Sequence, residues 1–76
     1  MKPDFEFDLK GEVCPYTFVK SKLALEMLES NQILQVVVDN DESATNVPKS
    51  MLNEGNTVLG VEKVNEKDWR LTFRKK

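Results

Sequence analysis

A strand, a glycine turn, a cysteine and the start of a helix follow one another in the segment Asp8-Leu9-Lys10-Gly11-Glu12-Val13-Cys14-Pro15-Tyr16-Thr17. Proline suits the first position of a helix, because the N–H that it lacks would have no partner there. Pro15 therefore predicts a helix start, and we expect Cys14 to lie where unpaired backbone N–H groups and the positive end of the helix dipole meet. A thiolate gains hydrogen bonds and a favourable field at such a position, so the sequence predicts a lowered pKa and a reactive sulfur at Cys14.

The residues around this segment predict two strands and a helix. Apolar and acidic residues alternate from Phe5 to Leu9, which is the pattern of a strand with one buried face. The chain from Pro15 to Glu29 consists largely of good helix formers, and Asn31 can take the left-handed conformation that closes a helix. Ile33 to Val38 is a β-branched run that fits a central strand, which the turn Asp39-Asn40-Asp41 ends.

A second helix is predicted from the apolar spacing between Ser43 and Asn53, with Gly55 as its stop. Pro48 leaves two alternatives for its start. The helix either begins near Asn46 as N-cap, or begins at Ser43 and kinks at the proline, and we favour the second.

The last third of the chain predicts a β-hairpin. Thr57 to Val64 forms one strand, Asn65 to Asp68 the turn, and Trp69 to Arg74 the other strand. The order βαβαββ in residues 1–76 predicts a single α+β domain, because a chain this short can build only two layers. We expect a two-layer α/β sandwich with two helices on one face of a four-stranded mixed sheet, and an edge position for the last strand.

Composition limits the classes of function. The 76 residues are 39% hydrophobic and 32% charged, which favours a small soluble globule over a disordered chain. The net charge of -2 argues against direct nucleic-acid binding, which relies on an excess of positive charge. One cysteine forms no internal disulfide, and Met1 to Phe5 lacks the apolar run of a signal peptide, so we expect a cytoplasmic protein that does not enter a membrane.

Missing residue types exclude several chemistries. The chain has no histidine and one cysteine, so it cannot by itself build a Cys/His zinc site, a Cys–His protease centre or a dithiol redox pair. Its three glycines are isolated and form no phosphate-binding loop. We expect neither a metal nor a cofactor, and any chemistry depends on the sulfur of Cys14.

The first predicted helix carries two apolar stripes. The first stripe is the better candidate for the core and has Thr17 at its N-terminal end; its members are Phe18, Ser21, Ala24, Leu25 and Leu28. The second stripe lies on nearly the opposite side and consists of Tyr16, Val19, Leu23 and Met27. In one interpretation Val19 and Leu23 contact the second helix, while Tyr16 and Met27 are scattered surface apolar residues. In the other, the stripe is a docking patch beside Cys14 for a partner or a weak homodimer.

Several residues near Cys14 are candidates for supporting roles. Gly11 suits the geometry of the turn, and Asp8 can hold the loop by accepting backbone N–H bonds. Lys10, Lys20 and Lys22 are either ordinary solvated lysines or a source of positive potential that favours the thiolate.

The spacing Asp8-x-x-Gly11-x-x-Cys14-Pro15 in a βαβαββ chain of this size resembles the TusA (SirA/YedF/YeeD-like) family of small sulfur-carrier proteins. The resemblance covers essentially the whole chain and implies that Cys14 carries a persulfide. It also implies sulfur-donor and sulfur-acceptor proteins as partners. Members of the family serve different pathways, which include tRNA thiolation, cofactor sulfuration, sulfur oxidation, thiosulfate use and selenium metabolism. The sequence does not indicate which of these pathways applies.

The chain departs from the family pattern at two places. Thr17 stands where the family commonly has a second proline, and a threonine there can hydrogen-bond locally. Leu23 and Met27 stand where many relatives carry polar residues, which favours the docking interpretation of the second stripe. Two alternatives remain open: an interaction or regulatory module in which Cys14 is a redox sensor or merely structural, and an RNA-binding module.

Overall fold

The computed structural model describes residues 2–13 and 16–76, so Cys14 and Pro15 lie outside the described residues. The elements of the described part follow the predicted order βαβαββ. They are β1 (Phe5–Asp8), α1 (Tyr16–Glu26), β2 (Ile33–Val38), α2 (Asp41–Asn53), β3 (Thr57–Lys63) and β4 (Trp69–Arg74).

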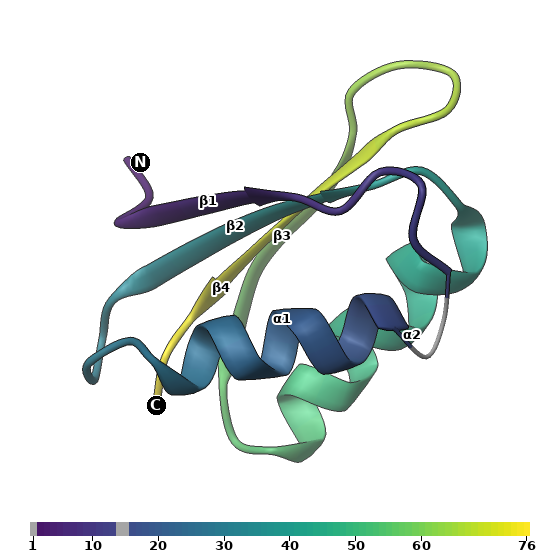
Figure 1. Ribbon diagram of the computed structural model, residues 1–76. Helices are drawn as coiled ribbons and strands as arrows, with labels where there is room; N and C mark the ends of the chain where they lie inside the picture. The colour runs from purple at the N-terminus through teal and green to yellow at the C-terminus, as the bar shows by residue number, and fades with distance from the viewer. Residues whose placement is uncertain (1, 14–15) are drawn as a thin grey trace.

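The strands form one mixed sheet in the order β1-β2-β4-β3. β1 runs parallel to β2, whereas β4 is antiparallel to both β2 and β3. The two helices of the described residues lie on the same side of this sheet (Figure 1). The predicted α+β fold, a two-layer sandwich, is therefore confirmed.

The core lies between the two central strands and the helices. Side chains of β2 alternate between buried and partly buried, as expected of a strand that presents one face to the helices. The first stripe of α1 faces this core as predicted, with Ser21, Leu25 and Leu28 buried. The fully buried hydrophobic side chains are Leu34, Val36, Val38, Val47, Met51, Leu71 and Phe73.

The first helix ends earlier than expected. α1 stops at Glu26 rather than Glu29, because the N–H groups of Met27 and Leu28 bond to the carbonyls three residues back, at 3.2 and 3.1 Å. Such bonds tighten the last turn of a helix and end its regular pattern. Asn31 has a φ of 71°, which confirms the predicted left-handed residue.

The second helix begins before both of its predicted starts. Asn40 is its N-cap, and the Asn40 Oδ1 atom accepts the N–H of Ser43 at 2.7 Å, so α2 begins at Asp41. Pro48 lies inside the helix, as in the alternative that we favoured. Gly55 follows the helix with a φ of +90°, and so confirms the predicted stop.

Two expectations about the strands are wrong. β4 lies between β2 and β3 rather than at an edge. The edge strand β1 has no fully covered face: Phe5 and Phe7 are 48% and 42% exposed, because α1 packs mainly against β2 and α2. β3 also ends at Lys63 and is irregular between Val58 and Gly60.

The same substitution, valine to alanine, should destabilise the protein more in the buried strand β2 than at an exposed position. Val36→Ala removes methyl groups from a fully buried site and should lower the free energy of unfolding by about 2 kcal/mol. Val61→Ala makes the same change at a side chain that is 45% exposed and should cost less than half as much. Urea denaturation of both variants checks this, and equal losses would contradict the assigned core.

Candidate functional site

The loop from Leu9 to Val13 leads from β1 toward Cys14, and its backbone is fixed at Gly11. Gly11 has a φ of +91°, a conformation that residues with a Cβ rarely adopt. A Cβ there would meet no atom within 4 Å, so the backbone angle rather than crowding requires the glycine. The N–H of Gly11 donates to the Asp39 Oδ2 atom at 2.9 Å, which ties this loop to the end of β2.

A second bond ties the same two loops together. The Asn40 Nδ2 atom donates to the carbonyl of Glu12 at 3.2 Å, while the other side-chain atom of Asn40 caps α2. We refer to Asp39 and Asn40 together as the Asp39–Asn40 anchor. Asp39 and Asn40 were not predicted as residues of the site, although an Asn or Asp before a predicted helix is a recognisable N-cap signal.

Asp8 and Lys10 bond one another at the start of the loop. The carboxylate of Asp8 accepts the backbone N–H of Lys10 at 2.9 Å and forms an ion pair with the Lys10 Nζ atom at 3.1 Å. The backbone bond, followed by the side-chain bond, lowers the pKa of Asp8. The Asp8 carboxylate in turn raises the pKa of Lys10, so the lysine stays charged and is held on Asp8.

The other two candidate lysines also have carboxylate partners. Lys20 pairs with Glu12 of the loop at 2.6 Å. Lys22 instead pairs with Glu54 at the end of α2, at 3.5 Å. Only Lys10 and Lys20 therefore bond residues of the segment that leads to Cys14.

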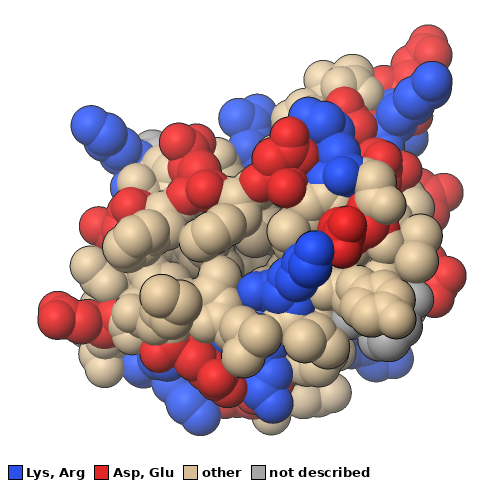
Figure 2. All heavy atoms as spheres, in the orientation of Figure 1, with Lys and Arg blue, Asp and Glu red and all other residues tan. Residues whose placement is uncertain are grey.

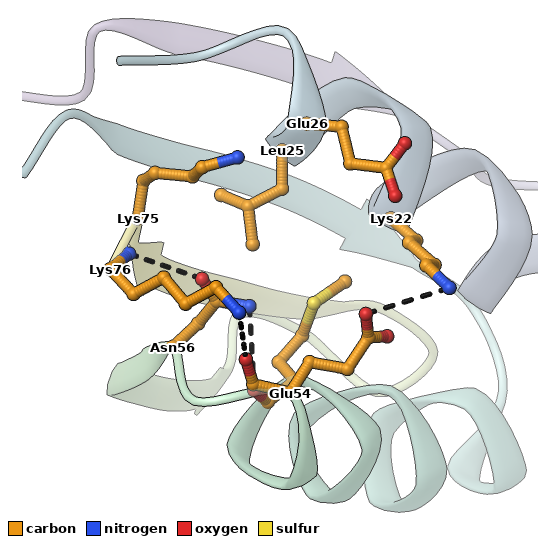
Figure 3. A pocket seen from close by; sticks show the side chains of 8 residues that line it. Lys22, Leu25, Glu26, Glu54, Asn56, Lys75 and Lys76 are labelled. Atoms are coloured by element: carbon orange, nitrogen blue, oxygen red, sulfur yellow. Dashed lines mark hydrogen bonds and ion pairs between the residues drawn. The ribbon is translucent and has the colours of Figure 1, made fainter. Parts of the chain in front are cut away.

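Lys22 belongs to a different part of the molecule, shown in Figure 3. It lines a small cavity near the C-terminal end of α2, where the Lys76 Nζ atom donates to the carbonyl of Glu54 at 2.9 Å. The remaining lining residues are Leu25, Glu26, Met51, Asn56 and Lys75. The backbone N–H of Lys76 also donates to the Asn56 Oδ1 atom at 3.1 Å, so two hydrogen bonds hold Lys76 against the end of α2.

Backbone hydrogen bonds join the described residues on either side of positions 14 and 15. The carbonyl of Val13 accepts the N–H groups of Tyr16 at 2.8 Å and Thr17 at 3.3 Å. Val13 and Tyr16 are 60% and 61% exposed, so both flanks of the cysteine are open to another molecule. The predictions for Cys14 and Pro15 themselves lie outside the described residues.

Thr17 connects the two helices. It is fully buried, and its Oγ1 atom lies 2.8 Å from the Oγ atom of Ser43, 26 residues further along the chain. Because Ser43 is also the residue that Asn40 caps, Thr17 packs α1 against the same helix start that holds the loop. Its side chain thus reaches across to α2.

The second stripe of α1 is exposed along its length. Tyr16, Val19, Leu23 and Met27 are all on the surface, and Met27 is the most exposed at 85%. Part of the stripe forms one wall of an apolar groove whose other wall is β1. We refer to it as the β1–α1 groove; its apolar lining is Phe5, Phe7, Leu9, Leu23, Ala24, Met27, Leu28 and Val36. Figure 2 shows uncharged surface between β1 and α1, with one basic side chain lying across it.

The described residues contain neither a candidate metal site nor a candidate membrane-spanning helix. Residues 2–13 and 16–76 contain no group of three or more Cys, Asp or Glu side chains that could hold a metal ion. Within the same residues, neither helix has the length and apolar character needed to cross a membrane.

The fold of the described residues places the chain in a class of small α+β proteins. The SirA-like protein from Desulfitobacterium hafniense, solved by crystallography, superposes with a TM-score of 0.82 at 28% sequence identity, over 92% of this chain and 95% of that one. The model of the family described as "Sulfurtransferase TusA" matches residues 5–75. The chain therefore belongs to the TusA family, and the resemblance found in its sequence is confirmed.

Curated relatives carry matching names. A "Putative sulfur carrier protein" from Archaeoglobus fulgidus is 48% identical over 69 residues, which are 91% of this chain and 78% of the relative. The "Putative sulfur carrier protein YedF" of Escherichia coli K12 is 40% identical over 60 residues, 79% of this chain and 78% of the relative. Family membership and these names together support a role as a sulfur carrier.

Because Asn40 both caps α2 and bonds Glu12, we expect Asn40→Ala and Asn40→Asp to differ in their effect on stability. Asn40→Ala removes both the cap of α2 and the bond to Glu12, and should lower the free energy of unfolding by about 1–2 kcal/mol. Asn40→Asp keeps an oxygen for the cap and loses only the donor to Glu12, so it should cost clearly less. Thermal denaturation of both variants measures the difference, and identical losses would show that the cap contributes nothing.

Proposed function

We propose that this protein carries sulfane sulfur as a persulfide on Cys14, taking it from a donor protein and relaying it to an acceptor. The observation that carries the proposal is the fixed loop that leads to the chain's only cysteine. The Asp39–Asn40 anchor holds Gly11 and Glu12, and the residues on either side of positions 14 and 15 are exposed. Membership of the TusA family supplies the chemical class of the reaction.

Loading is a displacement at sulfur. The thiolate of Cys14 attacks the outer sulfur of a donor persulfide, a bond forms between the two sulfurs, and the donor leaves as its thiolate while the proton stays on the transferred sulfur. With thiosulfate the same attack releases sulfite. A lowered thiol pKa raises the fraction of thiolate available for this step.

Delivery reverses the roles. A nucleophile of the acceptor attacks the outer sulfur of the Cys14 persulfide, and Cys14 leaves as a thiolate. The same lowered pKa makes Cys14 a better leaving group. Between the two steps the persulfide of Cys14 loses its proton to solvent, and we propose that the start of the helix stabilises the resulting anion, as helix starts stabilise other anions.

The neighbouring residues have positioning roles in this proposal. Asp8 and Gly11 fix the path of the loop, and Thr17 fixes the first turn of α1 against α2. Pro15 would set the helix start. Lys10 places a positive charge at the beginning of the loop, but its ion pair with Asp8 offsets that charge. We therefore assign Lys10 the smallest effect on the thiolate of Cys14.

Docking of the donor and the acceptor is assigned to the second stripe. Tyr16, Val19 and Leu23 are exposed apolar residues on α1, Met27 directly follows the helix, and Tyr16 is two positions from Cys14 in the sequence. Contiguous exposed apolar surface commonly marks a site for a partner protein. A carrier needs such a surface more than it needs a deep pocket, because its substrate is presented by another protein.

Intact-mass spectrometry tests the proposal. Incubation with thiosulfate or a persulfide donor should add one sulfur, about 32 Da, to the protein, and the added mass should disappear on reduction. Cys14→Ser should gain nothing, because the chain has no other cysteine. Absence of any gain in the unsubstituted protein under excess donor would overturn the proposal and favour a regulatory or structural role for Cys14.

A further inference from the structure

One edge of the sheet has backbone groups with no partner strand in the described part of the chain. β1 is the first strand in the order β1-β2-β4-β3, so only β2 pairs with it. The N–H of Leu9 donates to the carbonyl of Val37 at 2.8 Å, which turns the backbone groups of Leu9 toward β2. Because this direction alternates along a strand, those of Phe5 and Phe7 also face β2, whereas those of Glu6 and Asp8 face outward. The open edge therefore offers N–H and C=O groups to an added strand.

The side chains of β1 point alternately to the two faces of the sheet. Phe5 and Phe7 enter the β1–α1 groove, where both remain nearly half exposed. Because side chains alternate along a strand, Glu6 and Asp8 lie on the opposite face of the sheet, where Lys10 is their neighbour. Asp8 is paired with Lys10, and Glu6 has no ion-pair partner among residues 2–13 and 16–76. A strand added at this edge would meet on one face a groove that is apolar except for Lys20, and on the other face the unpaired carboxylate of Glu6 beside the Asp8–Lys10 ion pair.

A second copy of the chain fits this edge poorly. Two β1 strands related by a two-fold axis must run antiparallel, and residues directly opposite each other then lie on the same face. Every register that sets one phenylalanine of β1 opposite another also sets a carboxylate opposite a carboxylate, namely Glu6 opposite Asp4, Glu6 or Asp8. Like charges directly opposite one another destabilise such a pair, as is common at edges that avoid self-association.

We propose that β1 binds an extended segment of a partner protein in which apolar residues alternate with lysine or arginine. Its backbone would bond to Glu6 and Asp8, its apolar side chains would fill the β1–α1 groove beside Phe7 and Met27, and its basic side chains would lie beside Glu6. The inference deepens the proposed function and rests on it only for the identity of the partner as a sulfur donor or acceptor. It extends the docking surface from α1 to the strand across the groove.

Binding of designed peptides tests this directly. An eight-residue peptide that alternates leucine and lysine should bind, with NMR shifts confined to residues 4–10 and the groove-lining part of α1. A peptide of the same composition with its leucines and lysines in two blocks should bind at least about tenfold more weakly, as should one that alternates leucine and glutamate, because like charges would then meet. Equal binding of the three peptides would overturn the proposal.

Substitutions in β1 separate the backbone contribution from the charge contribution. Glu6→Pro removes an outward N–H at an edge position that tolerates proline, and should abolish peptide binding. Glu6→Lys should exchange the preference, favouring the leucine–glutamate peptide by about tenfold. The matched control Glu66→Lys makes the same change in charge in the turn between β3 and β4 and should leave binding unchanged. Unaltered binding in both Glu6 variants would contradict the proposed site.

The remaining outcomes are distinguishable. Sulfur loading on Cys14 without peptide binding overturns this inference and leaves the proposed function standing, whereas peptide binding without sulfur loading does the reverse. Analytical ultracentrifugation addresses the second copy. If the protein is a dimer that Met27→Glu dissociates, and no peptide binds, the groove is occupied by another copy of the chain and the inference is wrong.

Discussion

The contact between the loop after β1 and the loop after β2 is the constraint on which the rest of the site depends. Because β1 and β2 are parallel neighbours, their carboxyl ends lie at the same edge of the sheet. Asp39 and Asn40 of the second loop can therefore hold Gly11 and Glu12 of the first. The Asn40 side chain also starts α2, so one residue fixes both the approach to Cys14 and the position of a helix.

The way α1 packs against α2 explains both the burial in the core and the exposed surface beside it. Thr17 reaches Ser43 at the start of α2, and the first stripe of α1 covers β2. A helix held there leaves β1 only partly covered. The packing that holds the first turn of α1 against α2 therefore also leaves Phe5 and Phe7 in an open groove beside the second stripe.

Local patterns in the sequence predicted the elements and their order, because alternation and turn residues act over a few positions. The strand Trp69–Arg74, the left-handed Asn31 and the stop at Gly55 are examples. Alternation in β1 indicated which side chains share a face, but not whether a helix covers that face. That depends on the order of strands in the sheet, which also makes β4 an interior strand. The anchor was not predictable from local patterns, since Gly11 and Asp39 are 28 residues apart.

In the proposed function, the chain's one thiol is reactive because the loop that leads to it and the helix start predicted at Pro15 stabilise its thiolate. The pH dependence of alkylation measures this directly, since the thiolate is the reacting form and the chain has no second cysteine to compete. Iodoacetamide should modify the protein with a midpoint clearly below about 8.5, the value for an ordinary thiol. A midpoint at or above that of a free cysteine in the same buffer would contradict the claim.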